Sequence, residues 1–138
     1  MIVVDTNVLS EFMRPNPSGR VRQWASGQEP SSLFTTSITV AEIWFGIQRL
    51  SDVQRKERFA EAASDLFSAF AERVLVFDRQ AAEVYARIAV RRAESGLPID
   101  GFDAQIAAIC TTHDATLATR NTKDFENTGV PLVDPWSD

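Results

Sequence analysis

The first ten residues, Met1–Ser10, read MIVVDTNVLS. The apolar run Ile2–Val4 predicts a short buried strand, and the acidic residue Asp5 follows it directly. Asp, Thr and Asn are all common N-cap residues, so Asp5 fits the start of a helix. Ligands of open α/β sheets bind beyond the carboxyl ends of the strands, so Asp5 equally fits a functional site. Residues Met1–Ser10 alone leave both interpretations open.

The composition is that of an ordinary globular chain. Its 138 residues suit one hydrophobic core, and we expect a single domain over residues 1–138. The net charge of −5 and the sequence pI of 4.9 argue against nucleic-acid binding through a broad basic surface, for which a domain pI above about 9 is expected. An acidic site whose charge is offset by a bound cation is still compatible with a nucleic-acid enzyme.

Two residue types that often carry chemistry occur once each. Cys110 is the only cysteine and His113 the only histidine, which excludes an intrachain disulfide, a thiolate zinc site and a two-histidine metal site. The opening apolar run is too short for a signal peptide and has no basic segment before it. No apolar run approaches the roughly 18 residues of a membrane span. We therefore expect a cytoplasmic protein without membrane contact.

Short apolar or β-branched runs alternate with helical periodicity along the chain. Strands are predicted at Ile2–Val4, Leu33–Ser37, Val74–Phe77, Thr116–Thr119 and Pro131–Val133. Helices are predicted at Val8–Met13, Arg20–Ser26, Val40–Leu50, Gln54–Glu72, Ala81–Glu94 and Ala104–Thr112. The helix Val40–Leu50 is apolar on nearly every side, so we expect it to be largely buried. The alternation predicts an α/β fold with a mostly parallel sheet and helices on both faces.

Four acids stand where strands meet the following segments: Asp5, Glu42, Asp103 and Asp124. If the strands are parallel, all four fall at the same edge of the sheet. Carboxylates gathered in one cleft repel one another unless a cation lies among them, and Mg²⁺ or Mn²⁺ prefers such hard oxygen ligands. A cation held this way can activate water and polarise a phosphate, which makes phosphodiester hydrolysis the favoured reaction class.

Each acid also has a purely structural interpretation. Glu42 stands three residues after Thr39, which is the spacing of a capping box at the start of a helix. Asp103 competes with Asp100 for the N-cap of the following helix, and Asp124 fits a solvated turn. The pattern of strand, acid and helix is not specific, because Asp78 shows it too and is assigned here as a cap only.

Five stretches taken in order, VVDTNVLSE, TVAEIWFGI, DAQIAAIC, LATRNTKDF and LVDPW, resemble the PIN-domain ribonucleases. More narrowly, they resemble the VapC-type toxins of bacterial type II toxin–antitoxin pairs. The resemblance covers nearly the whole chain. It implies a five-stranded parallel sheet between helices and Mg²⁺- or Mn²⁺-dependent endonucleolytic cleavage of RNA. It also implies a homodimer and a cognate antitoxin whose C-terminal segment blocks the cleft, commonly with a basic side chain.

By position, the acidic quartet of the PIN-domain ribonucleases falls on Asp5, Glu42, Asp103 and Asp124. The resemblance implies that Asp5 and Asp103 are the main metal ligands and that Glu42 orients a water on the metal. Asp124 would complete the cluster. All four acids are therefore expected to be catalytic and metal-binding.

Three further residues are expected to support the site. Thr6 corresponds to the small polar residue that follows the first acid of the family, and Asn121 borders the same site within the TRN segment. Arg120 lies beside the site, and we expect it to contact RNA phosphates, which attract arginine whatever the base sequence.

Two other classes of protein also place acids around Mg²⁺ in a small α/β domain. A phosphatase of the haloacid dehalogenase type needs a second Asp two residues after the first, and that position is Asn7. A receiver domain, which signals and is not an enzyme, needs paired acids after the first strand, and this pair is absent. The metal-dependent ribonuclease is the favoured interpretation, with these two as alternatives.

Overall fold

The computed structural model, which describes residues 1–137, contains one sheet of five parallel strands. The strands are β1 (Ile2–Val4), β2 (Leu33–Thr36), β3 (Val74–Leu75), β4 (Thr116–Ala118) and β5 (Leu132–Val133). Their order in space is β3-β2-β1-β4-β5, so β1 is central. The chain builds outward from β1 to one side and then restarts at β4 on the other. Such a switch point leaves a crevice at the carboxyl ends of the strands, here between β1 and β4.

Helices connect the strands within the described residues. They are α1 (Thr6–Phe12), α2 (Gly19–Ser26), α3 (Ser37–Gln48), α4 (Val53–Phe70), α5 (Arg79–Glu94) and α6 (Gly101–Thr112). Two 3₁₀ turns, η1 (Pro30–Ser32) and η2 (Thr122–Phe125), precede β2 and follow β4. In the part of the chain that the structure describes, none of the helices is long and apolar enough to cross a bilayer.

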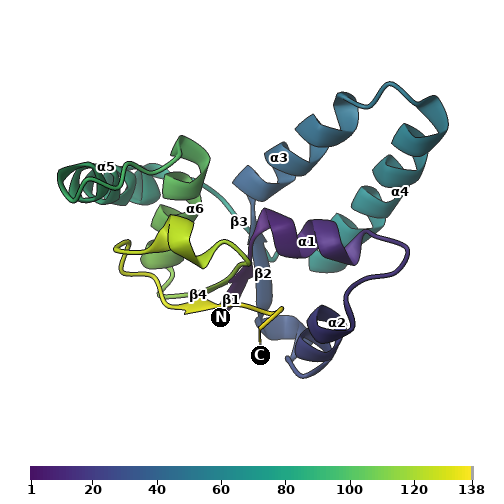
Figure 1. The fold of residues 1–138 in the computed structure, drawn as a ribbon, viewed down its shortest axis with the longest axis horizontal. Coiled ribbons are helices and arrows are strands. Elements are labelled where there is room, and N and C mark those ends of the chain that lie inside the picture. The colour runs from purple at the N-terminus through teal and green to yellow at the C-terminus, as the bar shows by residue number, and fades with distance from the viewer. Residues whose placement is uncertain (138) are drawn as a thin grey trace.

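The sheet separates two hydrophobic cores, because neighbouring side chains of a strand point to opposite faces. Val3 and Leu117 belong to a core shared with α5 and α6. Val4 and Ala118 belong to a second core, shared with α1, α3 and α4. Figure 1 shows α5 and α6 on one side of the strands and α1 to α4 on the other. The predicted α/β fold with helices on both faces is confirmed.

Every predicted element is present, but each of the six predicted helices begins one to three residues before its predicted start. The predicted starts were set by the first residues of the apolar period, and the polar residues of a first turn lie outside that period. Asp78, for example, caps α5 by accepting a hydrogen bond from Ala81 N (2.9 Å), so α5 begins at Arg79 and not at Ala81. The role of Asp78 as a cap is confirmed. Likewise Thr36 ends β2 and caps α3, which places Ser37 in the helix and not in the strand.

The expectation that the helix Val40–Leu50 is largely buried is wrong. In α3 only Thr39, Ile43 and Ile47 are buried, at intervals of four residues, while Phe45 is 64% exposed. The reason is that α3 and α4 pack against each other as a two-helix arm that extends away from the sheet (Figure 1). One stripe of α3 is therefore fully buried, Ile38 and Trp44 are partly buried against the two cores, and Phe45 faces solvent.

Candidate functional site

Asp5 lies at the junction between β1 and α1, at the carboxyl end of the central strand. The residue is 4% exposed, and its Oδ1 accepts a hydrogen bond from Thr6 N (2.8 Å). Its Oδ2 accepts hydrogen bonds from Thr119 Oγ1 (2.7 Å) and Asn7 Nδ2 (3.1 Å). A carboxylate offers about four acceptor positions, so these donors fix its orientation and leave about one position free. Asp5 therefore caps α1 and is also held in place by β4, which a simple cap does not need.

Glu42 lies in the second turn of α3, and its Oε1 accepts a hydrogen bond from Thr6 Oγ1 (2.7 Å). The cap of this helix is Thr36, whose hydroxyl accepts a hydrogen bond from Thr39 N (3.1 Å). Glu42 is therefore too far along α3 to form a capping box, and that interpretation is wrong. The predicted helix start at Val40 put Glu42 in the first turn, which is also wrong, because α3 begins at Ser37. Its contact with Thr6 joins α3 to α1 beside Asp5.

A chain of threonine hydroxyls leads to the Glu42 carboxylate. Oγ1 of Thr39 lies 3.4 Å from Oγ1 of Thr36 and 3.1 Å from Oγ1 of Thr6. Each hydroxyl has one proton to donate, and Thr6 donates its proton to Glu42, because a carboxylate only accepts. Thr39 therefore donates to Thr6, and Thr36 donates to Thr39. This arrangement orients the carboxylate and favours its charged form.

Asp103 lies in the first turn of α6 but does not cap the helix. The cap is Asp100, whose Oδ1 accepts hydrogen bonds from Phe102 N (2.9 Å) and Asp103 N (3.4 Å). The interpretation of Asp103 as a plain N-cap is therefore wrong. Its carboxylate is partly buried and has no capping role. Burial and the charges of the neighbouring acids act on it and raise its pKa.

Asp124 is exposed and lies in the turn η2, which begins four residues after the end of β4. Its main-chain N–H donates to Asn121 O (3.0 Å), and Asn121 N donates to Thr119 Oγ1 (3.1 Å). Because the Thr119 hydroxyl donates to Asp5, the turn that carries Asp124 is tied to the first acid of the site. Asn121 thus borders the site through its main chain.

The carboxylates of these segments repel one another. Burial raises the pKa of Asp5 above its ordinary value of 3.8, although the hydrogen bonds to its carboxylate oppose the rise. Burial also raises the pKa of Glu42, and the charges of Asp5 and Asp100 add to this rise. The pKa of Asp103 rises to about 7, through burial first and then through the charges of Asp5, Asp100, Asp124 and Glu42. Acids from four segments of the chain therefore act on one another.

Basic side chains do not compensate this negative charge in the part of the chain that the structure describes. The one ion pair found among residues 1–137 at 4.0 Å or less joins Arg14 to Glu11. Within the same residues, no three Asp, Glu, His or Cys side chains form a closed metal site. The site is thus a set of carboxylates that interact through their charges without a partner of opposite sign.

Arg120 lies between β4 and the turn η2 that carries Asp124. Its main-chain N–H donates to Asn7 Oδ1 (3.1 Å), and its guanidinium lies over the ring of Trp136, 4.9 Å from the ring centre. Arg20 Nη1 donates to Trp136 O (3.3 Å), which places a second arginine at this residue. The side chain of Arg120 is exposed. A positive, partly aromatic surface therefore lies next to the segment that carries Asp124.

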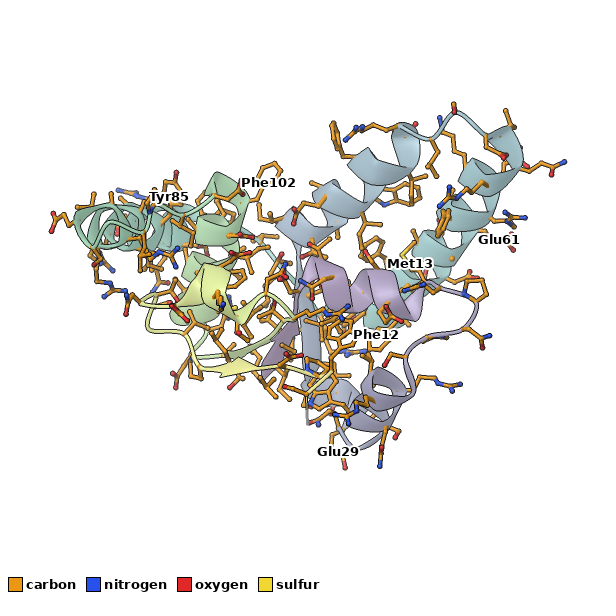
Figure 2. All side chains as sticks on the ribbon, viewed as in Figure 1. Phe12, Met13, Glu29, Glu61, Tyr85 and Phe102 are labelled. Atoms are coloured by element: carbon orange, nitrogen blue, oxygen red, sulfur yellow. The ribbon has the colours of Figure 1, made fainter. Side chains whose placement is uncertain are left out.

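An open groove of about 240 Å³ begins at Glu42 and Thr6 and runs between α1, α3 and α4. Its walls are mostly apolar and include Met13, Ile47 and Phe59. Figure 2 labels Met13 near the end of α1, on the side of the two-helix arm. The groove connects an apolar surface to the acids.

Three residues of the site were missed by the sequence predictions. Asp100 was considered only as a competing cap, yet its charge acts on both Glu42 and Asp103. Asn7 and Thr119 hold the Asp5 carboxylate. The parallel pairing of β1 with β4 could have indicated Thr119, because residues that directly follow paired strands meet at the same edge.

The chain matches one family profile and is similar over its full length to known proteins. A family profile described as the PIN domain matches residues 2–131. The VapC ribonuclease Y4jK of Sinorhizobium fredii is 36% identical over 137 residues, which cover 99% of this chain and 98% of that protein. The toxin FitB of Neisseria gonorrhoeae is 36% identical over 139 residues, which cover 100% of each.

Solved structures give the same result. The crystal structure of FitAcB from Neisseria gonorrhoeae superposes with a TM-score of 0.93 at 35% identity and covers 100% of both chains. A chain of a toxin–antitoxin complex from Klebsiella pneumoniae superposes with a TM-score of 0.69 at 26% identity, over 98% of each chain. The profile match, the full-length relatives and the shared parallel sheet show that this chain belongs to the PIN-domain family.

Proposed function

We propose that this chain is a divalent-metal-dependent endoribonuclease and the toxin of a toxin–antitoxin pair. The observation that carries the proposal is the cluster of mutually repelling carboxylates at the carboxyl edge of the sheet, without basic partners among residues 1–137. The ribonuclease name of the similar protein Y4jK supports the reaction class. The receiver and phosphatase alternatives gain no support from the comparisons.

The residues present fit a hard divalent cation, and we propose Mg²⁺ or Mn²⁺. Carboxylate oxygens are the donors that these ions prefer, and Asp5 retains about one free acceptor position. Asp5 and Asp103 would hold the cation, with Asp124 completing the set. Asp103 is partly buried and Asp124 exposed, and their carboxylates accept none of the hydrogen bonds that hold Asp5. When bound, the cation supplies positive charge to the scissile phosphate and the attacking water.

Glu42 is proposed as the residue that orients the attacking water and takes up its proton. Its carboxylate is fixed by the Thr6 hydroxyl, and burial raises its pKa toward the range useful for a base. As the water oxygen bonds to phosphorus, its proton passes to Glu42, and the phosphodiester P–O bond to the leaving oxygen breaks. Solvent then protonates the leaving oxygen.

An antitoxin partner is part of the proposal, since a solved structural relative is a toxin–antitoxin complex. The apolar groove that begins at Glu42 would receive an apolar segment of the antitoxin, and a basic side chain on that segment would pair with the acids. A homodimer is also proposed. Exposed apolar residues outside the groove fit such contacts, namely Val90 on α5 and Phe102 at the start of α6.

A cytoplasmic location belongs to the same proposal. Cys110 is buried and unpaired, which suits a reducing compartment. The proposed substrate, RNA, is synthesised and translated in that compartment.

Replacement of Asp5 tests the proposed activity. Asp5→Asn should lower RNA cleavage in Mn²⁺ by at least about 100-fold, because it removes a ligand charge. It should lower the free energy of unfolding by no more than about 3 kcal/mol: the amide oxygen still caps α1, but the new amide group faces the donors Thr119 and Asn7. Cleavage of a labelled RNA and urea unfolding measure the two effects.

Asp78→Asn is the matched control, because Asp78 also links a strand to a helix as an N-cap but lies outside the site. It should leave cleavage unchanged. Equal cleavage by both variants and the wild type would contradict the proposal.

The raised pKa of Asp103 gives a testable dependence on pH. In the unfolded chain this carboxyl loses its proton near 3.8, and in the folded chain near 7. Between these values the folded state binds more protons, so the free energy of unfolding should fall as pH rises from about 4 to about 7. Asp103→Asn should reduce this fall, and Mn²⁺ should oppose it because the ion binds the charged form.

Urea unfolding at about pH 5 and about pH 8, with and without Mn²⁺, measures the effect. The control Asp65→Asn changes an exposed acid on α4 and should leave the fall in place. The same pH dependence in the wild-type chain and the Asp103→Asn variant would show that folding does not raise the pKa of Asp103.

Arg120 is proposed to contact an RNA phosphate beside Asp124. Arg120→Ala should raise KM several-fold with little change in kcat, because one phosphate contact is lost without a change at the acids. The salt dependence of binding should also weaken by about 0.7 in the log–log slope, the value for one contact to a single strand. Arg87→Ala, an exposed arginine on α5, is the control. An unchanged salt slope for Arg120→Ala would remove Arg120 from the RNA-binding surface.

A further inference from the structure

Arg92, near the end of α5, is 5% exposed although its guanidinium is charged. Its Nε donates to Leu97 O (2.6 Å), and its Nη1 donates to Asp124 O (2.9 Å) and Glu126 O (2.6 Å). Within residues 1–137 it forms no ion pair with a carboxylate. All of its partners are main-chain carbonyls, so its contacts hold the path of the backbone.

The segments held by Arg92 both lead into the acidic site. Leu97 lies in the connection between α5 and α6, three residues before the cap Asp100 and six before Asp103. Asp124 is one of the acids itself, and its own carbonyl is a partner. Arg92 therefore joins the main chain that precedes Asp103 to the main chain of Asp124, through one rigid guanidinium.

The turn that carries Asp124 is held by few other contacts in the residues that directly follow Asp124. Phe125 is buried, and Thr128 Oγ1 donates to Phe125 O (2.7 Å). Arg91 Nη2 donates to Thr128 O (2.8 Å), four residues beyond Asp124. Arg92 alone of these groups bonds to the carbonyl of Asp124, while the carboxylate of that residue remains exposed on the turn.

We propose that Arg92 is a positioning residue, which sets the separation of Asp103 and Asp124 so that both can bind one divalent cation. This inference rests on the proposed metal-dependent function. Arg92 does not touch the substrate or the cation and acts through the backbone of the acids. Lysine at this position would keep the charge but could not donate in the same fixed directions to carbonyls from two segments.

The chain contains a matched control for this contact. Arg73 also donates to three main-chain carbonyls, those of Pro30 (2.6 Å), Leu33 (2.5 Å) and Ala69 (2.9 Å). It directly precedes β3 and bonds to the first residue of β2, so it lies at the amino ends of the parallel strands, opposite the acids. Arg73→Lys therefore removes the same kind of contact away from the site.

Calorimetric titration of the full chain with MnCl₂ tests the proposal. Arg92→Lys should weaken Mn²⁺ binding by about 10-fold or more and lower kcat for RNA cleavage by a similar factor, with KM nearly unchanged. Arg73→Lys should lower stability without either effect. In the double variant Arg92→Lys/Asp124→Asn, the loss of Mn²⁺ affinity should be smaller than the sum of the two single losses, because part of the effect of Arg92 passes through Asp124.

Four results separate the possible failures. Equal Mn²⁺ binding by Arg92→Lys and Arg73→Lys would overturn the role of Arg92, and so would additive losses in the double variant. If Asp124→Asn weakens Mn²⁺ binding while Arg92→Lys does not, only the role of Arg92 is lost and the proposed function stands. A wild-type chain that neither binds Mn²⁺ nor cleaves RNA would overturn the proposed function and, with it, the role of Arg92.

A measurement on the wild-type chain covers the case in which Arg92→Lys does not fold. Coupling between two sites is reciprocal, so if the Arg92 contacts favour metal binding, metal binding must favour the contacts. Addition of Mg²⁺ should slow hydrogen exchange at the Arg92 Nε–H, followed by NMR, and leave the Arg73 guanidinium unchanged. Unchanged exchange at Arg92 in a chain that binds Mg²⁺ would overturn the inference.

Discussion

Electrostatic repulsion among carboxylates at one edge of a parallel sheet is the constraint around which this protein is built. Parallel strands all end at the same edge, so the acids that follow β1 and β4 meet those in the second turn of α3 and the first turn of α6. Burial keeps water from screening their charges, and the pKa of Asp103 rises to about 7 as a result. A folded protein without a compensating cation retains this repulsion. The proposed metal explains why the fold tolerates it.

The structure holds the acids with contacts of quite different strength. Asp5 is buried and fixed by three donors, and Glu42 is fixed by the Thr6 hydroxyl. Asp103 and Asp124 are more exposed, and their position depends on the backbone that carries them. Two acids are thus preorganised, while two are placed on segments joined by Arg92. Asp5 and Glu42 are held by side-chain donors, and Asp103 and Asp124 by the backbone of their segments.

Sequence patterns predicted the strands and helices because apolar periodicity and strand–helix alternation are local properties. They located the cap role of Asp78 for the same reason. They did not predict the exposure of Phe45, since an apolar helix has the same pattern whether it lies in a core or in an arm. The spacing of Thr39 and Glu42 favoured a capping box because the true cap, Thr36, was taken to lie inside a strand.

The contacts that hold the site were harder to predict than its acids. The resemblance to PIN-domain ribonucleases indicated the four acids, but Asp100 and Thr119 act through contacts between segments far apart in the sequence. Arg92 bonds only to main-chain carbonyls, which leave no signature in residue types. Its role follows only from the path of the backbone in three dimensions.

Anomalous diffraction from crystals soaked in Mn²⁺ tests the central claim most directly. The account predicts a peak between Asp5 and Asp103, with carboxylate oxygens at about 2.1 Å from the ion and Asp124 drawn toward it. The account would be contradicted if saturating Mn²⁺ gave no peak and the carboxylate oxygens all accepted hydrogen bonds from main-chain and side-chain donors instead. The cluster would then be a set of caps and turns, and the ribonuclease proposal would lose its physical basis.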